Sequence, residues 1–219
     1  MADRTRTSIA NMAADFMDVD PIGNIADQYG DALIYNRNYQ EAVETVISEF
    51  EWNVVKTRAQ LNSATLPFDL DETDFQYAYT LPSDCLVIID INGRPIDDVR
   101  YAVESVAQYD AHGTPYNRRR VFLTDTESPV IMRYHSFIEP SDMSAHLAKA
   151  CALELAMRCI TKFRNSTTSM EQLRDLYSEA TKGNTKRKGG MQVDAKQNRP
   201  KPRRVLPSPR MKARYGEGL

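Results

Sequence analysis

Sequence motifs of catalysis are missing from this chain of 219 residues. It has no Gly-x-Ser-x-Gly nucleophile motif, no phosphate-binding P-loop and no glycine pattern for binding dinucleotides. Cys85 lies next to Asp84, but no base stands in a recognisable context to activate its thiol. We therefore predict that the protein is not an enzyme and uses no cofactor.

Cysteine and histidine are scarce, which argues against disulfides and metal sites. The three cysteines form no Cys-x-x-Cys pair and leave an odd count, so reduced, buried thiols in a cytosolic product are expected. The histidines are far apart and lack the spacing of metal ligands. These residues are Cys85, Cys151 and Cys159, and His112, His135 and His146.

Residues Asp69, Asp71, Glu72 and Asp74 resemble the opening of a calcium-binding loop. The sixth position of that loop requires Gly and is Asp74, and the twelfth requires Glu and is Thr80. The stretch is therefore predicted to be a solvated acidic loop, and no metal site is expected.

Long apolar runs are also absent. No segment approaches the roughly 18 apolar residues that a membrane span requires. The first twenty residues hold no apolar core of a signal peptide. We expect a protein that is made and used in water, with no membrane partner.

The net charge of −2 hides an asymmetry along the chain. Residues Lys182–Leu219 contain 12 Lys and Arg against 2 acidic residues, a net charge of +10, so the rest of the chain carries −12. An acidic body with a basic tail indicates two surfaces with different partners.

Apolar residues at three- and four-residue steps predict several helices. The longest runs from Asn36 to Leu61 and includes the only tryptophan, Trp52. Shorter helices are expected over Ser8–Met17 and, for a turn or two, over Asn24–Ile34. Met143–Phe163 is apolar almost all round, which predicts a central, buried helix.

Two serines are expected to cap later helices. Ser141 is positioned to accept an amide of the helix that starts near Met143. Ser169 and Gln172 fit a capping box before a last helix, which ends at Gly183 or at Gly189–Gly190. The helical pattern stops beyond Gly190.

The middle third predicts a small antiparallel sheet. Leu86–Ile89 is rich in β-branched residues, and Asn92-Gly93 favours a tight hairpin turn. A short strand is expected at Tyr101–Val103, followed by a loop over Ala111–Asn117. Arg120–Leu123 and Val130–Tyr134 resemble a second hairpin.

The predicted fold class is α+β, mainly α. It is an antiparallel helix bundle with an inserted small antiparallel β-sheet and an extended C-terminal tail. The expected segments are 1–68 for the first helices, 69–140 for the β-insertion, 141–189 for the last helices and 190–219 for the tail.

Two basic segments are candidates for binding. The cluster Arg118–Arg120 is either a solvated surface or a contact with DNA phosphates or a neighbouring subunit. The tail either binds nucleic acid without sequence preference or docks into an acidic or concave protein partner. Its candidate docking residues are Arg199, Lys201, Arg203, Arg204, Arg210, Met211, Lys212, Arg214 and Tyr215.

Several features together resemble a known family. Tyr39 precedes a helical stripe, Trp52 is followed by Lys56-Thr57-Arg58-Ala59-Gln60-Leu61, and Tyr79-Thr80-Leu81-Pro82-Ser83-Asp84-Cys85-Leu86 runs into a hairpin. An Ala- and Leu-rich helix follows Pro140. Over about residues 5–185 the chain resembles the head-to-tail adaptor (connector) family of tailed bacteriophages, which includes the podovirus tail tubular protein A. Relatives often carry Trp-x-Phe-Ala where this chain has Trp52-Asn53-Val54-Val55.

The resemblance implies a structural virion protein at the portal vertex, assembled in the host cytoplasm. It implies a homo-oligomeric ring, a dodecamer, between the portal protein and a tail (nozzle or tube) protein. DNA passes through the lumen during genome ejection without specific binding. By position and character, Lys196–Leu219 corresponds to the segment that docks on the portal. The alternative is a DNA-binding accessory protein that uses its basic tail.

Overall fold

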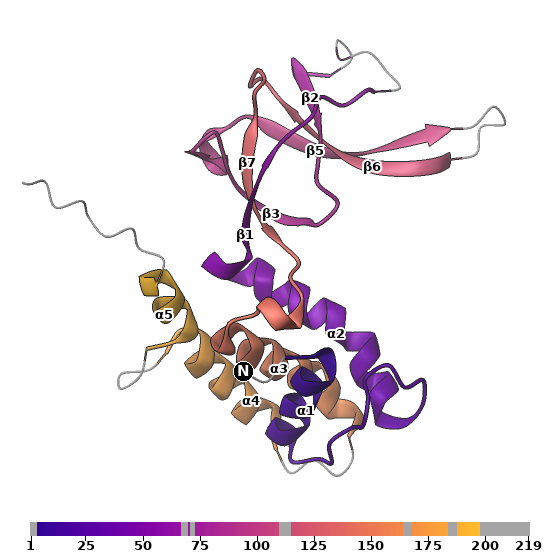
Figure 1. Ribbon diagram of the computed structural model, residues 1–219, viewed down its shortest axis with the longest axis vertical. Coiled ribbons are helices and arrows are strands. Elements are labelled where there is room, and N and C mark those ends of the chain that lie inside the picture. The colour runs from indigo at the N-terminus through magenta and orange to yellow at the C-terminus, as the bar shows by residue number, and fades with distance from the viewer. Residues whose placement is uncertain are drawn as a thin grey trace, which may run out of the picture.

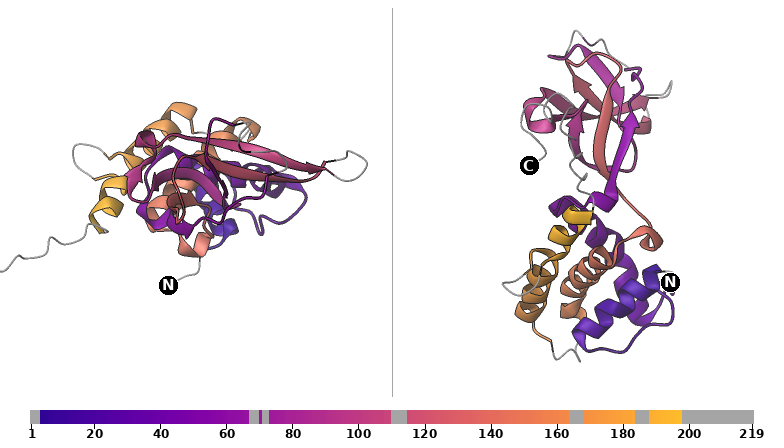
Figure 2. Two further views of the ribbon diagram at one scale, coloured as in Figure 1. Left: turned by 90° about the horizontal axis from the view of Figure 1, so that it is seen from above. Right: turned by 60° about the vertical axis from the view of Figure 1, so that its left-hand side comes forward.

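The structure, a computed structural model, describes residues 4–66, 70, 73–109, 115–163, 168–183 and 188–197. These residues form two lobes stacked along the long axis of the molecule (Figure 1). The helical lobe comprises the described residues of 4–55 and 137–197, and the β lobe those of 56–136. The chain crosses between the lobes twice, after the second helix and after the last strand (Figure 2).

The helical lobe is built around one buried helix. Its helices are α1 (Arg6–Met17), α2 (Gly30–Glu49), α3 (Ala145–Cys159), α4 (Met170–Thr181) and α5 (Gly190–Gln197). Helix α3 packs against α1, α2 and α4, and all of its leucines and all of its alanines except Ala145 are buried. The predicted central, buried helix is thereby confirmed, because only a helix that is apolar on nearly every side can contact three others at once.

Two side chains connect α2 to its surroundings. Arg158 of α3 reaches Glu41 of α2 at 2.8 Å and Glu154 of its own helix at 2.8 Å. Trp52, just beyond the end of α2, is fully buried, and its Nε1–H donates to the carbonyl of Val46 at 3.1 Å. The indole therefore fills the core beneath the second half of α2 and also satisfies its one donor.

The β lobe contains seven strands in two antiparallel sheets. One sheet has the order β1-β7-β3-β4 and the other has the order β2-β6-β5. A shared apolar core includes Tyr79, Phe122, Met132 and Tyr134 from both sheets. The strands are β1 (Lys56–Gln60), β2 (Tyr77–Thr80), β3 (Cys85–Ile91), β4 (Arg94–Pro95), β5 (Tyr101–Tyr109), β6 (Pro115–Thr124) and β7 (Ile131–Ser136).

The fold class predicted from the sequence, a mainly α bundle with a small inserted sheet, is wrong. The β part is a lobe of its own, with two sheets rather than one, and it is as prominent as the helices (Figure 1). The prediction missed β1 and found only the first three residues of the long β5, because their residues are mostly polar or half-exposed and apolar residues do not alternate cleanly.

The long helix predicted over Asn36–Leu61 differs at both ends. Helix α2 starts earlier, at Gly30, and ends at Glu49. Residues Asn53–Val55 form a 3-10 turn (η1), and Lys56–Gln60 is strand β1. Burying Trp52 against Val46 turns the chain away from the helix axis, so the helical spacing of Val54 is coincidental.

One predicted hairpin is confirmed and the other is wrong. Strands β3 and β4 pair around Asn92-Gly93, whose φ angles are 51° and 79°. Strands β6 and β7, in contrast, belong to different sheets: β6 pairs with β2 and β5, and β7 with β1 and β3. Strand β5 is much longer than Tyr101–Val103, and β6 begins at Pro115, within the predicted loop.

Of the two capping predictions, one is confirmed and one is wrong. Ser169 and Gln172 form the capping box of α4 as predicted. Helix α3 is capped by Ser144 instead of Ser141, which belongs to the 3-10 turn η4 (Pro140–Asp142). Helix α5 starts at Gly190, where the helical pattern was expected to stop. Residues 198–219 of the predicted tail lie outside the described residues.

Candidate interaction surfaces

Strands β5 and β6 form a two-stranded ribbon, here called the arm, that extends sideways from the β lobe (Figure 1). They pair from Tyr101↔Thr124 outward to Tyr109↔Pro115. Strand β2 pairs with β6 from Thr124 to Val121, and Leu81 just beyond β2 donates to the carbonyl of Arg120 at 3.1 Å. Within the described residues, the outer half of the arm therefore has no third strand, and a two-stranded ribbon alone is only marginally stable in water.

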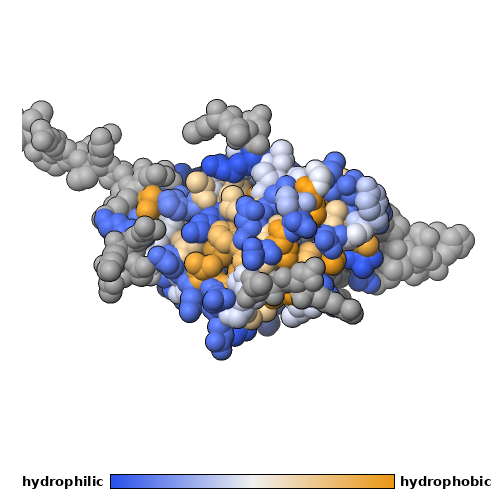
Figure 3. All heavy atoms as spheres, turned by 90° about the horizontal axis from the view of Figure 1, so that it is seen from below, coloured by the Kyte–Doolittle hydropathy of each residue, from blue (hydrophilic) through white to orange (hydrophobic). Residues whose placement is uncertain are grey.

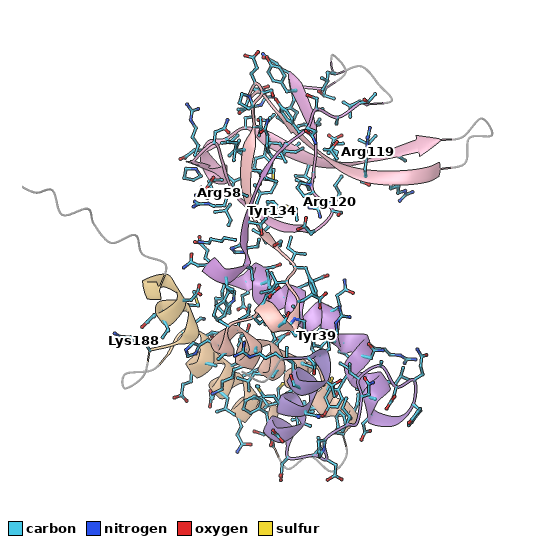
Figure 4. The ribbon with its side chains drawn as sticks, in the orientation of Figure 1. Tyr39, Arg58, Arg119, Arg120, Tyr134 and Lys188 are labelled. Carbon is cyan, nitrogen blue, oxygen red and sulfur yellow. The ribbon has the colours of Figure 1, made fainter. Side chains whose placement is uncertain are left out.

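The structure separates the three arginines of the predicted contact cluster. Arg120 donates from Nη1 to the carbonyl of Cys85 at 2.9 Å, and Arg119 donates from Nη2 to the carbonyl of Thr65. Both lie where the arm joins the body of the β lobe (Figure 4). Arg118 is exposed and has no hydrogen bond or ion pair within the described residues. Of the three, Arg118 alone makes no internal contact among the described residues, although Arg120 is also exposed.

Two apolar side chains on β5 are exposed, a feature that sequence reasoning did not identify. Tyr101 is 41% exposed and Val103 is 40% exposed. The Tyr101 ring stacks on Phe122 at 5.5 Å, which places both residues, with Val103, on one face of the arm. By alternation Arg118 shares this face. The sequence contains the alternation at residues 101, 103 and 105, but not the information that no other element of the described residues covers it.

Helix α5 (Gly190–Gln197), here called the root of the basic tail, packs against the rest of the helical lobe. Asp194 of α5 is buried, and its carboxylate accepts a hydrogen bond from the backbone N–H of Asn53. At Gly190 a Cβ atom would lie 2.7 Å from the Cβ of His146, so no side chain fits there. These contacts hold α5 beside η1. The predicted docking residues between Arg199 and Tyr215 lie outside the described residues.

The cysteines are free and buried, as the sequence predicted. Burial raises the pKa of the Cys85 thiol to about 11, even though the nearby Arg120 opposes this shift. Burial also raises the pKa of Cys151 and of Cys159 to about 12. All three thiols therefore stay protonated near neutral pH, which makes them poor nucleophiles.

The remaining polar residues from the sequence show no metal geometry. His135 is buried in β7 and His146 is exposed on α3, while His112 lies outside the described residues. In the part of the chain that the structure describes, no group of three or more His, Cys, Asp or Glu is placed to hold a metal ion. Nor does that part contain a helix that is long and apolar enough to cross a membrane.

A cleft of about 390 Å³ lies between the two lobes. One wall is the end of α2 with Glu49, Phe50 and Glu51, and the other is the β3–β4 hairpin with Ile89 and Asp97. Arg133 and His135 of β7 also line it. Arg133 is held by an ion pair with Asp90.

The lower face of the helical lobe mixes apolar and hydrophilic residues (Figure 3). Among the described large hydrophobic residues, Tyr29 is the most exposed, at 74%. The arm, the root of the tail and the cleft are candidate interaction surfaces of the described residues. No protein-family model and no curated protein sequence matches this chain.

Proposed function

We propose that this protein is a structural virion protein, a head-to-tail adaptor whose copies form a ring, a dodecamer, between the portal and the tail. The observation that supports this most is the arm. Its outer half lacks a third strand within the described residues, and one face exposes Tyr101 and Val103 near its base and Arg118 further out. Such a ribbon gains stability when a neighbouring subunit covers it, and a ring supplies a neighbour for every arm.

The division of charge also supports a conduit for DNA. Acidic residues outnumber basic ones in the helical lobe, whereas the sequence after Gln197 is strongly basic. An acidic wall does not grip phosphates, so DNA passes through the lumen without specific binding. The basic tail serves a different contact, with the portal protein, while the tail (nozzle or tube) protein attaches on the other side. The ring then lets the genome leave during ejection.

Truncation after Gln197 tests this role. Because Asp194 holds α5 in place upstream of the cut, the helical lobe is expected to remain folded. The truncated chain should no longer attach to the portal, as measured by co-sedimentation with purified portal rings of the same virus. Circular dichroism provides the control for folding. Attachment that persists with a native spectrum would remove the tail from the proposal.

The second candidate is a DNA-binding accessory protein. The basic tail favours it, whereas Arg119 and Arg120 each already donate one hydrogen bond to an internal carbonyl group. A gel-shift assay of the full chain at about 50 and 200 mM salt distinguishes the two, since binding through phosphates weakens steeply with salt. A strong shift that is lost at the higher salt concentration would favour the accessory protein.

A further inference from the structure

The cleft between the lobes contains a buried hydrogen-bond acceptor that lacks a donor. His135 is 2% exposed, and its Nδ1 lies 3.1 Å from the carbonyl oxygen of Ile47. A carbonyl oxygen only accepts, so Nδ1 carries the ring proton and Nε2 is a bare acceptor. Nε2 is buried without a partner. A buried acceptor without a donor is unfavourable, so a ligand that brings an N–H group is favoured here.

The rim of the cleft is acidic. Asp97 is exposed and has no ion-pair partner within the described residues. The Glu51 side chain is 75% exposed and forms an ion pair with Lys56 at 3.1 Å. Because the pair is solvated, it is weak and leaves the Glu51 carboxylate able to attract a further cation. Glu49 accepts a hydrogen bond from the Tyr177 hydroxyl and carries a third carboxylate. These groups repel phosphates and attract guanidinium and ammonium groups.

The walls of the cleft are partly apolar. Phe50 is mostly buried, while Ile89 and Ile96 are half-buried and line the opening. A ligand that brings aliphatic side chains as well as cations would bury this surface. The combination of an N–H acceptor, carboxylates and aliphatic walls fits a basic peptide segment that contains branched apolar residues.

Such a segment follows α5 in the sequence, and α5 lies near the cleft. Asp194 holds α5 to Asn53, which is two residues beyond the cleft residue Glu51. From α5 the chain continues into Arg199–Leu206, with the sequence RPKPRRVL. Its four cations, Arg199, Lys201, Arg203 and Arg204, supply N–H donors, and Val205 and Leu206 supply branched apolar side chains. We propose that the cleft binds Arg199–Leu206 of the same chain before assembly.

The short connection makes weak contacts sufficient. A tethered segment has an effective concentration near the millimolar range, so even a site with millimolar affinity for the free peptide is substantially occupied. If the tail attaches to the portal, as the proposed function holds, the cleft keeps the tail folded back until the portal competes for it. The binding itself does not depend on that role.

Disulfide trapping in the full chain tests the proposal. The test variant carries Asp97→Cys with Arg203→Cys, and the control carries Glu127→Cys, in the β6–β7 connection, with Arg203→Cys. The native thiols are buried and do not compete. At about 50 mM salt the test pair should form its disulfide about tenfold faster than the control pair, and high salt should reduce the difference. Equal rates in the two variants would overturn the proposal.

The mass of the trapped product identifies whose tail occupies the cleft. A disulfide within monomers supports the same chain, and one found only between chains, at a rate that rises with concentration, overturns it in favour of a neighbouring copy. In the unmodified chain, trypsin should cut after Arg204 about fivefold slower at low salt than in a free peptide of this sequence. Neither assay contains portal or DNA, so a failure here leaves the adaptor role untouched.

Discussion

Ser144 begins helix α3 at the point where the chain returns from the β lobe. Its Oγ accepts the backbone N–H of Leu147 at 3.2 Å and thus satisfies one of the free amides of the first turn. Ser144→Ala should lower the free energy of unfolding by about 1 kcal/mol. Ser141→Ala is the matched control: Ser141 is exposed in η4 and should change little. Urea unfolding monitored by Trp52 fluorescence measures both, and equal losses would contradict the assignment of the cap.

His135 should make the protein sensitive to mild acid. Burial lowers the pKa of its imidazole, and the nearby Lys56 adds to this, although the Ile47 carbonyl and Glu51 oppose the shift. The unfolded chain therefore takes up a proton at this site at a higher pH than the folded chain. The contribution of neutral His135 to the free energy of unfolding is fully present above pH about 6.5, the pKa of histidine in the unfolded chain. It decreases as the pH falls below that value and levels off below the pKa of the folded protein.

The matching variant is His135→Asn, which keeps a donor near the carbonyl of Ile47 but does not titrate. The wild type should lose more unfolding free energy than this variant when the pH falls from about 7 to 5. Urea titrations at both pH values measure the difference, with His146→Asn on the exposed side of α3 as the control. Parallel losses in the wild type and His135→Asn would show that protonation of His135 does not destabilise the fold.

Single residues were predictable where the cause is local. The capping box of Ser169 and Gln172 and the turn at Asn92-Gly93 depend only on a few neighbouring residues, and both predictions are confirmed. The exposure of Tyr101 and the missing partner of His135 depend on which distant elements cover them. No short sequence pattern contains that information.

At the scale of elements, sequence patterns identified helices better than strands. Helices α1, α3 and α4 bury one face or nearly all faces, and their apolar spacing reveals it. Strand β1 is polar at every position except Ala59, and β5 is solvated over much of its length, so neither shows a clear apolar period of two. The pairing of β6 with β7 was predicted wrongly because the two strands are neighbours in the sequence, and the sequence does not show that they belong to different sheets.

Helix α5 is short, and one buried carboxylate holds it. Asp194→Ala leaves the backbone N–H of Asn53 without its acceptor and should destabilise the docking of α5 by about 1–3 kcal/mol. Hydrogen exchange of residues 190–197 should accelerate accordingly, while that of α3 changes little. Gln192→Ala is the control, since this exposed side chain makes one hydrogen bond of 3.3 Å to Lys182. Unchanged exchange of α5 in Asp194→Ala would mean that other contacts carry the docking.

At the scale of the whole molecule, each lobe supplies a different part of the proposed ring. The β lobe contributes the arm, and the helical lobe carries the root of the tail on the opposite side of Figure 1. Contacts between different patches on successive subunits are head-to-tail, and they close into a ring when the rotation per subunit divides a full turn. The arm is therefore expected to contact a neighbour, and the tail to contact the portal.

Val103→Lys tests the arm within the assembly. Val103 is half-exposed on the face that carries Tyr101, so the monomer should tolerate a long, charged side chain there, whereas a covered interface should not. A buried, unpaired charge costs several kcal/mol, enough to abolish each subunit contact. Electron microscopy of the protein mixed with portal rings should then show portals without the added ring. Tyr29→Lys on the helical lobe is the control and should assemble normally. Complete rings of Val103→Lys would exclude this face of the arm from the subunit interface.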